Sequence, residues 1–294
     1  MNILICYNII YTYVNNVFII YKREQAVYIV TNPYNSFKVT IIILSYNGDL
    51  YIEETINSAI KQSYKNIEII IIDDHSKSET VNKILHFNEN PKIQIFLNKE
   101  NKGITYNLNK VVLNLDSDFF LLLGHDDIIP ANHVETMLSE FDDETISVHC
   151  NSYIIDSLGK KKKLLKTDSI QQDHSQPEKI FNALAIDNFI SSCGMLHRTK
   201  IFKLVKGWEP KYKNYGEWLY YINSLKFGHI KYTTKTIAFY RIHETNITKT
   251  FNKKGIKNDV ISYKNYCRHK AFKLAKKNLP FLIRYLFIKI KSRY

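Results

Sequence analysis

Cysteine is scarce in this chain of 294 residues, and the few thiols are far apart. Cys6, Cys150, Cys193 and Cys267 show no Cys-x-x-Cys spacing. This pattern argues against a disulfide framework and against a structural zinc site. We therefore expect buried, unpaired thiols in a protein of the reducing cytosol.

Two glycine-rich nucleotide-binding motifs are also missing. The chain has no G-x-x-x-x-G-K-[ST] sequence, which argues against a P-loop, and no G-x-G-x-x-G sequence, which argues against a dinucleotide-dependent oxidoreductase. If the protein binds phosphate groups, side chains and a metal ion must hold them.

Most of the chain lacks an excess of either charge. The formal net charge is +13, but residues 249–294 alone contain 14 lysines and arginines and a single acid, Asp259. Residues 1–248 carry 27 basic and 27 acidic side chains. A neutral body without a nucleic-acid-binding motif argues against DNA or RNA as a partner.

The N-terminus lacks the basic region and the small-residue cleavage site of a secretory signal. Residues 3–21 contain no charged side chain and are long enough to cross a bilayer, although they include three asparagines. Three interpretations stay open for this segment: an extra strand or helix packed on the domain, a membrane-inserted segment, or a consequence of the choice of start site. We treat residues 1–36 as an apolar N-terminal extension.

From residue 38 onward, short apolar runs alternate with amphipathic segments. Four β-branched, apolar runs predict buried strands, at 38–46, 66–74, 92–98 and 118–127. The segments between them have helical spacing and predict helices, at 48–63, 78–87 and 103–115. This order predicts an α/β fold with a mostly parallel sheet and helices on both faces.

The second half of the chain is less regular. Strands are predicted at 146–156, at the start of 191–205 and at 229–243, and helices at 177–188, at the end of 191–205 and at 216–228. A basic turn is predicted at 157–163. No internal repeat or low-complexity linker divides the chain, so we expect one domain over residues 37–248.

Polar residues follow each of the first four predicted strands, where ligands bind in such sheets. Asp73 and Asp74 end the second strand, and Asp126 and Asp127 end the fourth. Two carboxylate pairs at one edge repel each other unless a cation lies between them. Because Mg²⁺ and Mn²⁺ bind carboxylate and phosphate oxygens, we expect a metal-bridged diphosphate here.

Several ordered motifs in this region resemble family-2 glycosyltransferases with a GT-A type fold. They are "VTIIILSYN", "IIDDHS", "NKGITYNLN", "LLLGHDD" and a late "YRIH", and the resemblance runs from about Val39 to His243. It implies a Rossmann-like sheet with a small acceptor-side region. It also implies transfer of a sugar from a nucleotide-diphosphate donor to an acceptor hydroxyl, with inversion and with Mg²⁺ or Mn²⁺. Residues 37–130 would form the nucleotide-binding half and residues 131–248 the acceptor half.

The resemblance assigns one group of residues to donor binding. These residues follow the first three strands, and they are Ser45, Tyr46, Asn47, Asp73, Asp74, Asn101 and Gly103. Asp74 takes the position of the acid that contacts the base. Residue by residue, simpler alternatives exist: Asp73 and Asp74 could cap the following helix, and residues 101–103 could be a plain turn.

A second group is assigned to the metal and the diphosphate. Asp126 matches the last acid of the family's Asp-x-Asp motif, and Asp127 matches the acid that often follows it. Gly124 stands where the family has the first Asp, so the resemblance defines metal binding better than sugar identity. His125 is assigned to substrate binding, with a solvated histidine at a strand end as the alternative.

The "YRIH" motif places Arg241 near the diphosphate and His243 as a further metal or phosphate ligand. For Arg241, a surface ion pair is the alternative.

An inverting transfer needs a carboxylate that takes the proton of the acceptor hydroxyl. In the family this acid opens a helix soon after a Gly-Trp turn. Here Gly207 and Trp208 precede Glu217, which is therefore the candidate base. The alternative is an acid that only interacts favourably with the helix dipole.

The basic tail, residues 249–294, alternates apolar and cationic side chains and is divided by Pro280. This composition is typical of an amphipathic helix on an anionic membrane surface. A helix packed on the domain with a solvated basic face is the alternative.

Together these features predict a cytoplasmic glycosyltransferase, peripheral at the inner face of the cell membrane, that acts in surface polysaccharide or lipid-linked glycan synthesis. The expected donor is a UDP- or dTDP-sugar, and the expected acceptor is a saccharide or a lipid-linked saccharide. We expect no nucleic-acid partner. Two alternatives stay open: a nucleotide-sugar-binding homologue with weak or no activity, and a membrane-surface scaffold.

Overall fold

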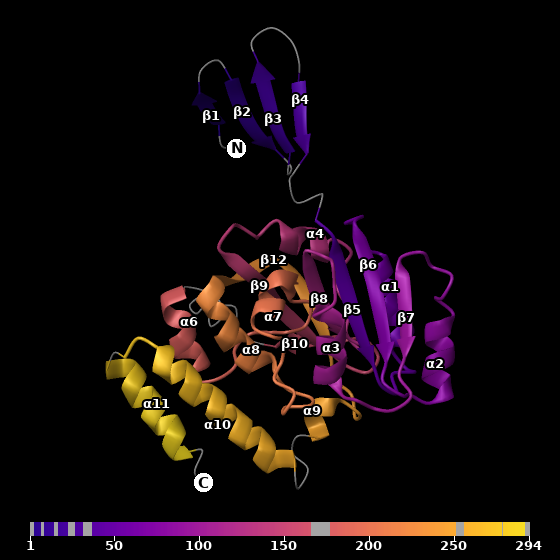
Figure 1. Ribbon diagram of the computed structural model, residues 1–294, viewed down its shortest axis with the longest axis vertical. Coiled ribbons are helices and arrows are strands. Elements are labelled where there is room, and N and C mark those ends of the chain that lie inside the picture. Colours follow the sequence, from indigo (N-terminus) through magenta and orange to yellow (C-terminus); the bar gives the residue numbers. More distant parts are fainter. Residues whose placement is uncertain are drawn as a thin grey trace.

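The computed structural model describes residues 3–6, 9–14, 17–22, 27–31, 37–165, 177–250, 256–277 and 279–291. The first four strands form an antiparallel sheet in sequence order, and they are β1 (Ile3–Cys6), β2 (Ile9–Val14), β3 (Val17–Lys22) and β4 (Val27–Thr31). Figure 1 shows this small sheet apart from the rest of the chain. Within the described ranges, no helix has both the length and the apolar character needed to cross a membrane.

The main sheet has the strand order β10-β9-β11-β8-β5-β6-β7 in the part of the chain that the structure describes, and β12 pairs with β9. The predicted parallel strands are present as β5 (Val39–Ser45), β6 (Ile67–Asp73), β7 (Ile93–Leu97) and β8 (Phe119–Gly124). The acceptor half extends this sheet with β9 (Thr145–Ile155), β11 (Leu196–Arg198) and β12 (His229–Arg241). β11 is antiparallel to both of its neighbours, whereas β12 runs parallel to β9.

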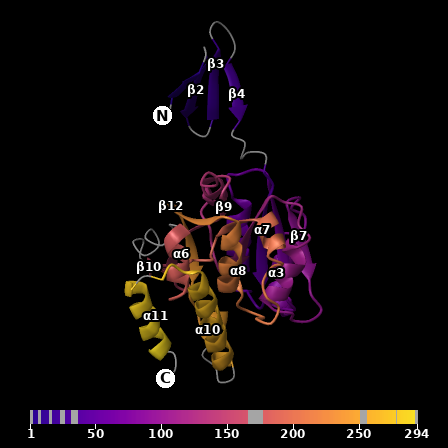
Figure 2. The same ribbon diagram turned by 60° about the vertical axis from the view of Figure 1, so that its left-hand side comes forward.

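Helices cover both faces of the main sheet, as the sequence predicted (Figures 1 and 2). Three helices pack into one hydrophobic cluster, and they are α1 (Ile52–Ile60), α2 (Ser78–Leu85) and α4 (His133–Leu138). The other cluster contains α3 (Ile104–Val112), α6 (Pro177–Leu184), α7 (Thr199–Leu204) and α8 (Glu217–Ser224), which is followed by the 3₁₀ turn η2 (Leu225–Phe227).

The continuous apolar run of β5 follows from this two-sided burial. Ile41 and Ile43 point into one cluster and Ile42 into the other, because successive side chains of a strand alternate between faces. All three are fully buried, and each contributes about 2 kcal/mol of hydrophobic free energy. A strand covered on both faces has no polar side to show in its sequence.

The predicted basic turn at 157–163 is partly wrong. The turn itself is present, with Gly159 at φ 78°, but the chain then continues as β10 (Lys161–Leu164), antiparallel to β9. Its lysine side chains are exposed, which suits an edge strand, because charge discourages pairing with another chain.

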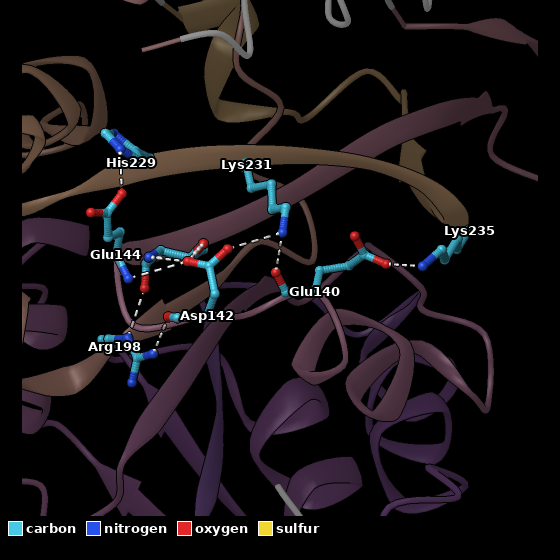
Figure 3. A network of polar contacts seen from close by, with 8 residues as sticks. Glu140, Asp142, Glu144, Arg198, His229, Lys231 and Lys235 are labelled. Carbon is cyan, nitrogen blue, oxygen red and sulfur yellow. Dashed lines mark hydrogen bonds and ion pairs between the residues drawn. The ribbon is translucent and has the colours of Figure 1, made fainter. Parts of the chain in front are cut away.

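A surface network fastens the beginning of β12 to the chain before β9 (Figure 3). Lys231 donates to the Glu140 carbonyl oxygen at 2.9 Å and pairs with Asp142 at 3.3 Å. His229 contacts Glu144 at 3.1 Å, and Figure 3 also shows Lys235 beside Glu140 and Arg198 beside Asp142. We call these seven residues the β12-start network.

Three helices follow β12, and they are α9 (Ile247–Thr250), α10 (Ile256–Leu274) and α11 (Leu279–Lys291). α10 buries Tyr263 and Cys267 in the cluster that contains α6 and α8. The thiols of Cys150, Cys193 and Cys267 are buried and free, as predicted, whereas the side chain of Cys6 lies outside the described residues.

Candidate active site

Three strand ends meet at one edge of the main sheet. β5 lies between β6 and β8, and the parallel register pairs Ser45 with Asp73 and Leu44 with Gly124. The predicted donor and metal residues that follow these strands are therefore brought to the carboxyl edge, which faces downward in Figure 1.

Asp74 is held by the segment that starts α3. Its carboxylate accepts hydrogen bonds from the backbone N–H groups of Lys102 at 2.9 Å and Gly103 at 2.8 Å, and from Asn98 Nδ2 at 2.9 Å. Burial alone would raise the pKa of Asp74, but these hydrogen bonds outweigh it and lower the pKa. Asp74 is therefore an ionised, fixed acceptor.

Asp73 closes the turn between β6 and α2. Its carboxylate accepts from the Ser76 backbone N–H at 2.8 Å and from the Ser76 hydroxyl at 2.5 Å. Asn47, with φ 51°, joins the same turn, because its Oδ1 accepts from the Lys77 backbone N–H at 3.1 Å. These contacts fix the loop before α2, but Asp73 does not cap that helix, because the N-cap of α2 is Lys77 and it has no side-chain cap hydrogen bond.

Two of the other predicted donor residues are open to solvent. Tyr46 is 49% exposed, and Asn101 is exposed on the segment before Gly103. Ser45 is buried, and its Oγ has no hydrogen-bond partner among the described residues. Gly103 has φ 82°, a conformation that favours glycine and lets its N–H reach Asp74.

Asp126 is held by the chain that follows β12. Its Oδ2 accepts from His243 Nε2 at 2.9 Å and from Asn246 Nδ2 at 3.0 Å. Burial alone would raise the pKa of Asp126, but the hydrogen bond from His243 and the charges of His125 and His243 outweigh it and lower the pKa. Asp126 is thus an ionised carboxylate with a histidine at its side.

The glycine that replaces the family's first acid lies directly under this carboxylate. A Cβ atom on Gly124 would lie 2.7 Å from Asp126 Oδ1 and 3.3 Å from Asp127 Oδ2. His125 turns the other way and covers Gly48, where a Cβ atom would lie 2.4 Å from its Cδ2. Both glycines allow a side chain of the 125–127 turn to lie against the backbone.

Asp127 points inward, away from the open edge. Its Oδ1 accepts from the Arg241 backbone N–H at 3.1 Å, and its carbonyl oxygen accepts from the Thr55 hydroxyl at 2.8 Å. Burial, followed by the charge of Asp126, raises the pKa of Asp127 well above its ordinary value. The structure therefore separates the two neighbouring acids into an outer and an inner one.

Arg241 is a buried connector with only 1% of its surface exposed. Its guanidinium pairs with Glu54 of α1 at 2.5 Å and donates to the carbonyl oxygens of Asp126 at 2.9 Å and Asp156 at 3.2 Å. It also lies 4.6 Å from the centre of the Tyr51 ring. Arg241 thus ties α1, the 125–127 turn and the end of β9 together.

Glu217 begins α8, as predicted, and its Oε2 accepts from the Gly216 backbone N–H at 3.0 Å. Burial raises the pKa of Glu217. Burial and then the Glu217 charge raise the pKa of Tyr263 of α10, so the Glu217 carboxylate lies on the side of α8 near α10.

The loop before Glu217 contacts the start of α3 through other residues. Asn214 Oδ1 accepts from the Ile104 backbone N–H at 3.4 Å, and the carbonyl oxygen of Lys213 accepts from the Thr105 backbone N–H at 2.9 Å. The structure therefore adds Asn214 and Asn246 to the predicted site. For Asn246 the sequence does contain a signal, because it follows His243 by three residues in "HETN".

The donor set at Asp126 suits a divalent cation. Two ligands about 2.1 Å from one ion and at right angles lie about 3 Å apart, close to the 2.9 Å between Asp126 Oδ2 and His243 Nε2. Carboxylate and imidazole both bind Mn²⁺, and carboxylate binds Mg²⁺. Among the described residues, no three His, Cys, Asp or Glu side chains form a group that could hold a metal ion, so a cation at Asp126 would need phosphate or water oxygens as its other ligands.

Comparison with known proteins identifies the family of this fold and site. The sequence model of Glycosyl transferase family 2 matches residues 40–205, more than half of the chain. The chain belongs to glycosyl transferase family 2. It is 31% identical to an uncharacterized glycosyltransferase of Rickettsia prowazekii (strain Madrid E) over 220 residues, which are 72% of this chain and 66% of the relative.

A second relative has a more specific name. The chain is 28% identical over 161 residues to WfgD of Escherichia coli, a UDP-Glc:alpha-D-GlcNAc-diphosphoundecaprenol beta-1,3-glucosyltransferase. The match covers 55% of this chain and 58% of WfgD. The chain thus spans less than two thirds of the length of both relatives.

Solved structures establish the fold. TarS 1–349 of S. aureus in complex with UDP-GlcNAc superimposes with a TM-score of 0.57 at 14% identity, covering 84% of this chain and 78% of that one. Mannosyltransferase PcManGT from Pyrobaculum calidifontis, in complex with GDP-Man and Mn²⁺, gives 0.53 at 12% identity, covering 88% and 82%. The fold of this glycosyltransferase is therefore the GT-A type that its sequence predicted.

Proposed function

We propose that this family-2 glycosyltransferase moves a sugar from a nucleotide-diphosphate sugar to an acceptor hydroxyl, with inversion and with a divalent cation. The observation that carries the proposal is the pair Asp74 and Asp126, which are ionised acids at the ends of β6 and β8 on either side of β5. A nucleoside at Asp74 and a cation at Asp126 leave the diphosphate between them, where it balances the charge of the cation.

Asp74 is proposed to select a base that presents an N–H group. A carboxylate has about four acceptor positions, and the protein occupies three of them with N–H donors. The remaining position suits the ring N–H of uracil or thymine, so the donor is a UDP- or dTDP-sugar. Solvent-exposed Tyr46 and Asn101 lie on the loops that flank this position and are proposed to contact the nucleotide.

Asp126 and His243 are proposed to hold Mg²⁺ or Mn²⁺, with Asp127 fixing the turn from inside. When bound, such an ion neutralises charge on the leaving diphosphate. Asn246 keeps the Asp126 carboxylate in place, and buried Arg241 holds the backbone of the same turn. His125, on the outer side of this turn, is proposed to contact the donor.

Glu217 is proposed as the general base. Its raised pKa makes it a stronger proton acceptor than an ordinary carboxylate. In this step the acceptor oxygen bonds to the anomeric carbon and its proton goes to Glu217. The bond from that carbon to the phosphate oxygen breaks, and the nucleoside diphosphate leaves.

The proposed acceptor is a saccharide, carried on a lipid at the inner face of the cell membrane. The name of WfgD supports this class of acceptor, since it specifies a diphosphoundecaprenol-linked sugar. The resulting role is the synthesis of surface polysaccharide or lipid-linked glycan.

The test is a thermal-shift and hydrolysis screen with nucleotide sugars, with and without Mn²⁺. A cognate donor raises the melting temperature, because it binds only the folded chain. EDTA should remove hydrolysis, and Asp74→Asn should weaken the shift for UDP-sugars about tenfold in affinity. Full activity in EDTA would contradict the metal assignment.

A second candidate is a homologue that binds a nucleotide sugar without turnover. It is favoured by Gly124, which lies beside the Asp126 and Asp127 carboxylates and stands where the family has an acid. Glu217→Gln separates the two candidates. If the base assignment is right, transfer falls while donor binding stays; an unchanged transfer rate removes Glu217 as the base.

A further inference from the structure

α11 is apolar on its outer side as well as on its inner side. Phe281 and Tyr285 are buried, and Tyr285 stacks on Phe272 of α10 with 4.1 Å between ring centres. On the opposite side Ile283, Leu286 and Phe287 are 61%, 56% and 59% exposed. A helix that only covers a soluble domain carries polar residues on its solvent side, so this second apolar side needs another explanation.

The three exposed residues form one stripe. Their spacing of three and four positions places them on the same helix face, and we call them the outer apolar stripe. Contiguous exposed apolar side chains of this kind mark interaction sites more often than isolated ones do.

The surroundings of the stripe are strongly basic. Residues 249–294 contain 14 lysines and arginines and one acid. Exposed cations lie on the same hairpin: Lys273 near the end of α10, Lys277 between the two helices, and Arg284 next to Ile283 on α11. Apolar residues bordered by cations are complementary to a surface whose interior is apolar and whose boundary is negative.

We propose that the α10–α11 hairpin docks on an anionic phospholipid surface. The outer apolar stripe enters the boundary between headgroups and acyl chains, and the flanking cations lie over lipid phosphates. α11 has 13 residues, fewer than the roughly 20 that a spanning helix needs, so it lies along the surface.

Docking of the hairpin would also position the active site relative to the lipid surface. α10 and α11 extend to the same end of the molecule as the carboxyl edge of the sheet (Figures 1 and 2). α10 is fixed to α8, because the Leu219 backbone N–H donates to the Tyr263 hydroxyl at 3.1 Å. Lipid docking would therefore hold the edge beside lipid-linked acceptors; this placement rests on the proposed function, whereas the lipid contact does not.

The test is flotation of the full chain with vesicles of phosphatidylcholine, with and without phosphatidylglycerol. We expect binding to the anionic vesicles, weakened by salt. The variant Ile283→Ser/Leu286→Ser/Phe287→Ser should lower the partition coefficient at least about tenfold. The control Leu85→Ser/Leu158→Ser/Leu204→Ser removes three exposed leucines elsewhere and should not lower it.

A charge variant tests the second half of the argument. Lys273→Gln/Lys277→Gln/Arg284→Gln should lower binding to anionic vesicles about tenfold or more. Lys65→Gln/Lys160→Gln/Lys163→Gln gives the same net charge from exposed positions outside the hairpin and should bind like the parent chain. Equal loss in both charge variants would overturn a specific docking face.

Two further outcomes would overturn the proposal: full vesicle binding by the stripe variant, or a stable dimer that the stripe variant converts to monomer. Donor hydrolysis without lipid is measured in parallel. A stripe variant that hydrolyses donor normally but no longer binds vesicles supports the docking face. A chain that binds vesicles but hydrolyses no donor would contradict the proposed function and leave the docking face supported.

Discussion

The two ends of β12 hold polar residues in opposite ways. At its start, the β12-start network lies on the surface, with the side chains of His229 and Lys231 each 42% exposed (Figure 3). At its end, Arg241 and His243 are buried against Asp126 and its neighbours. Exposed pairs are screened by water and contribute little, whereas buried ones fix geometry and are costly to break.

Polar burial already begins in the middle of the strand. His133 of α4 contacts the Thr236 hydroxyl at 2.9 Å and the Gly194 carbonyl oxygen at 2.7 Å. His149 of β9 is buried beside Tyr232, with 5.2 Å between ring centres. Along β12, buried side chains alternate with partly or fully exposed ones as far as Lys235, and the strand ends at the buried Arg241.

The largest expected effect concerns acid stability. Burial lowers the pKa of His133 to about 4 and those of His149 and His197 to about 3. In the unfolded chain these groups take up protons near pH 6.5, so stability is full above that pH and falls below it. At pH 5 each histidine should cost about 2 kcal/mol.

Urea unfolding at pH 7.5 and pH 5 measures this loss. Equal unfolding free energies at the two pH values would mean that burial does not hold these three histidines neutral in the folded chain.

The second effect is on activity. Asp126→Asn keeps the shape of the side chain but removes the charge that a cation needs. We expect the transfer rate with Mn²⁺ to fall about 100-fold or more. Glu144→Gln, a loss of charge at the other end of β12, should leave the rate within about twofold. Equal effects of both variants on the transfer rate would contradict a functional difference between the two ends of β12.

A smaller effect is expected at Asn246. Its amide donates to Asp126 and to the Arg241 carbonyl oxygen at 3.1 Å, and its Oδ1 accepts from the His243 backbone N–H at 2.5 Å. Asn246→Ala should weaken Mn²⁺ binding about tenfold, as expected for a residue that orients metal ligands. A Mn²⁺ titration followed by melting temperature checks this, and an unchanged midpoint would make Asn246 a purely structural residue.

The smallest effect is expected at the solvated end. Lys231→Gln removes an exposed pair with Asp142 and should change the free energy of unfolding by less than about 0.5–1 kcal/mol. High salt should shrink even this difference. A loss above 2 kcal/mol would show that the β12-start network stabilises the fold as a buried site does.

The nucleotide-binding half could be predicted because its signal is local. Each apolar strand run is continuous in the sequence, and the acids that end β6 and β8 closely follow the runs of those strands. β10 was missed because a lysine-rich edge strand has no apolar run to mark it.

Side-chain directions in the site could not be predicted in the same way. Asp126 and Asp127 are adjacent in the sequence, but one faces the edge and the other faces the backbone of Arg241. Asn214 joins the site only because the loop before α8 folds onto the start of α3. These contacts depend on how distant segments pack, and no local pattern records them.

The space above Gly124 has a consequence for protein engineering. Because a β-carbon there would lie 2.7 Å from Asp126 Oδ1, any larger residue at position 124 must displace the Asp126 carboxylate. Such a substitution would therefore disturb the carboxylate that is proposed to hold the cation. Efforts to retarget the sugar should therefore begin on the loops facing the donor and leave this backbone position alone.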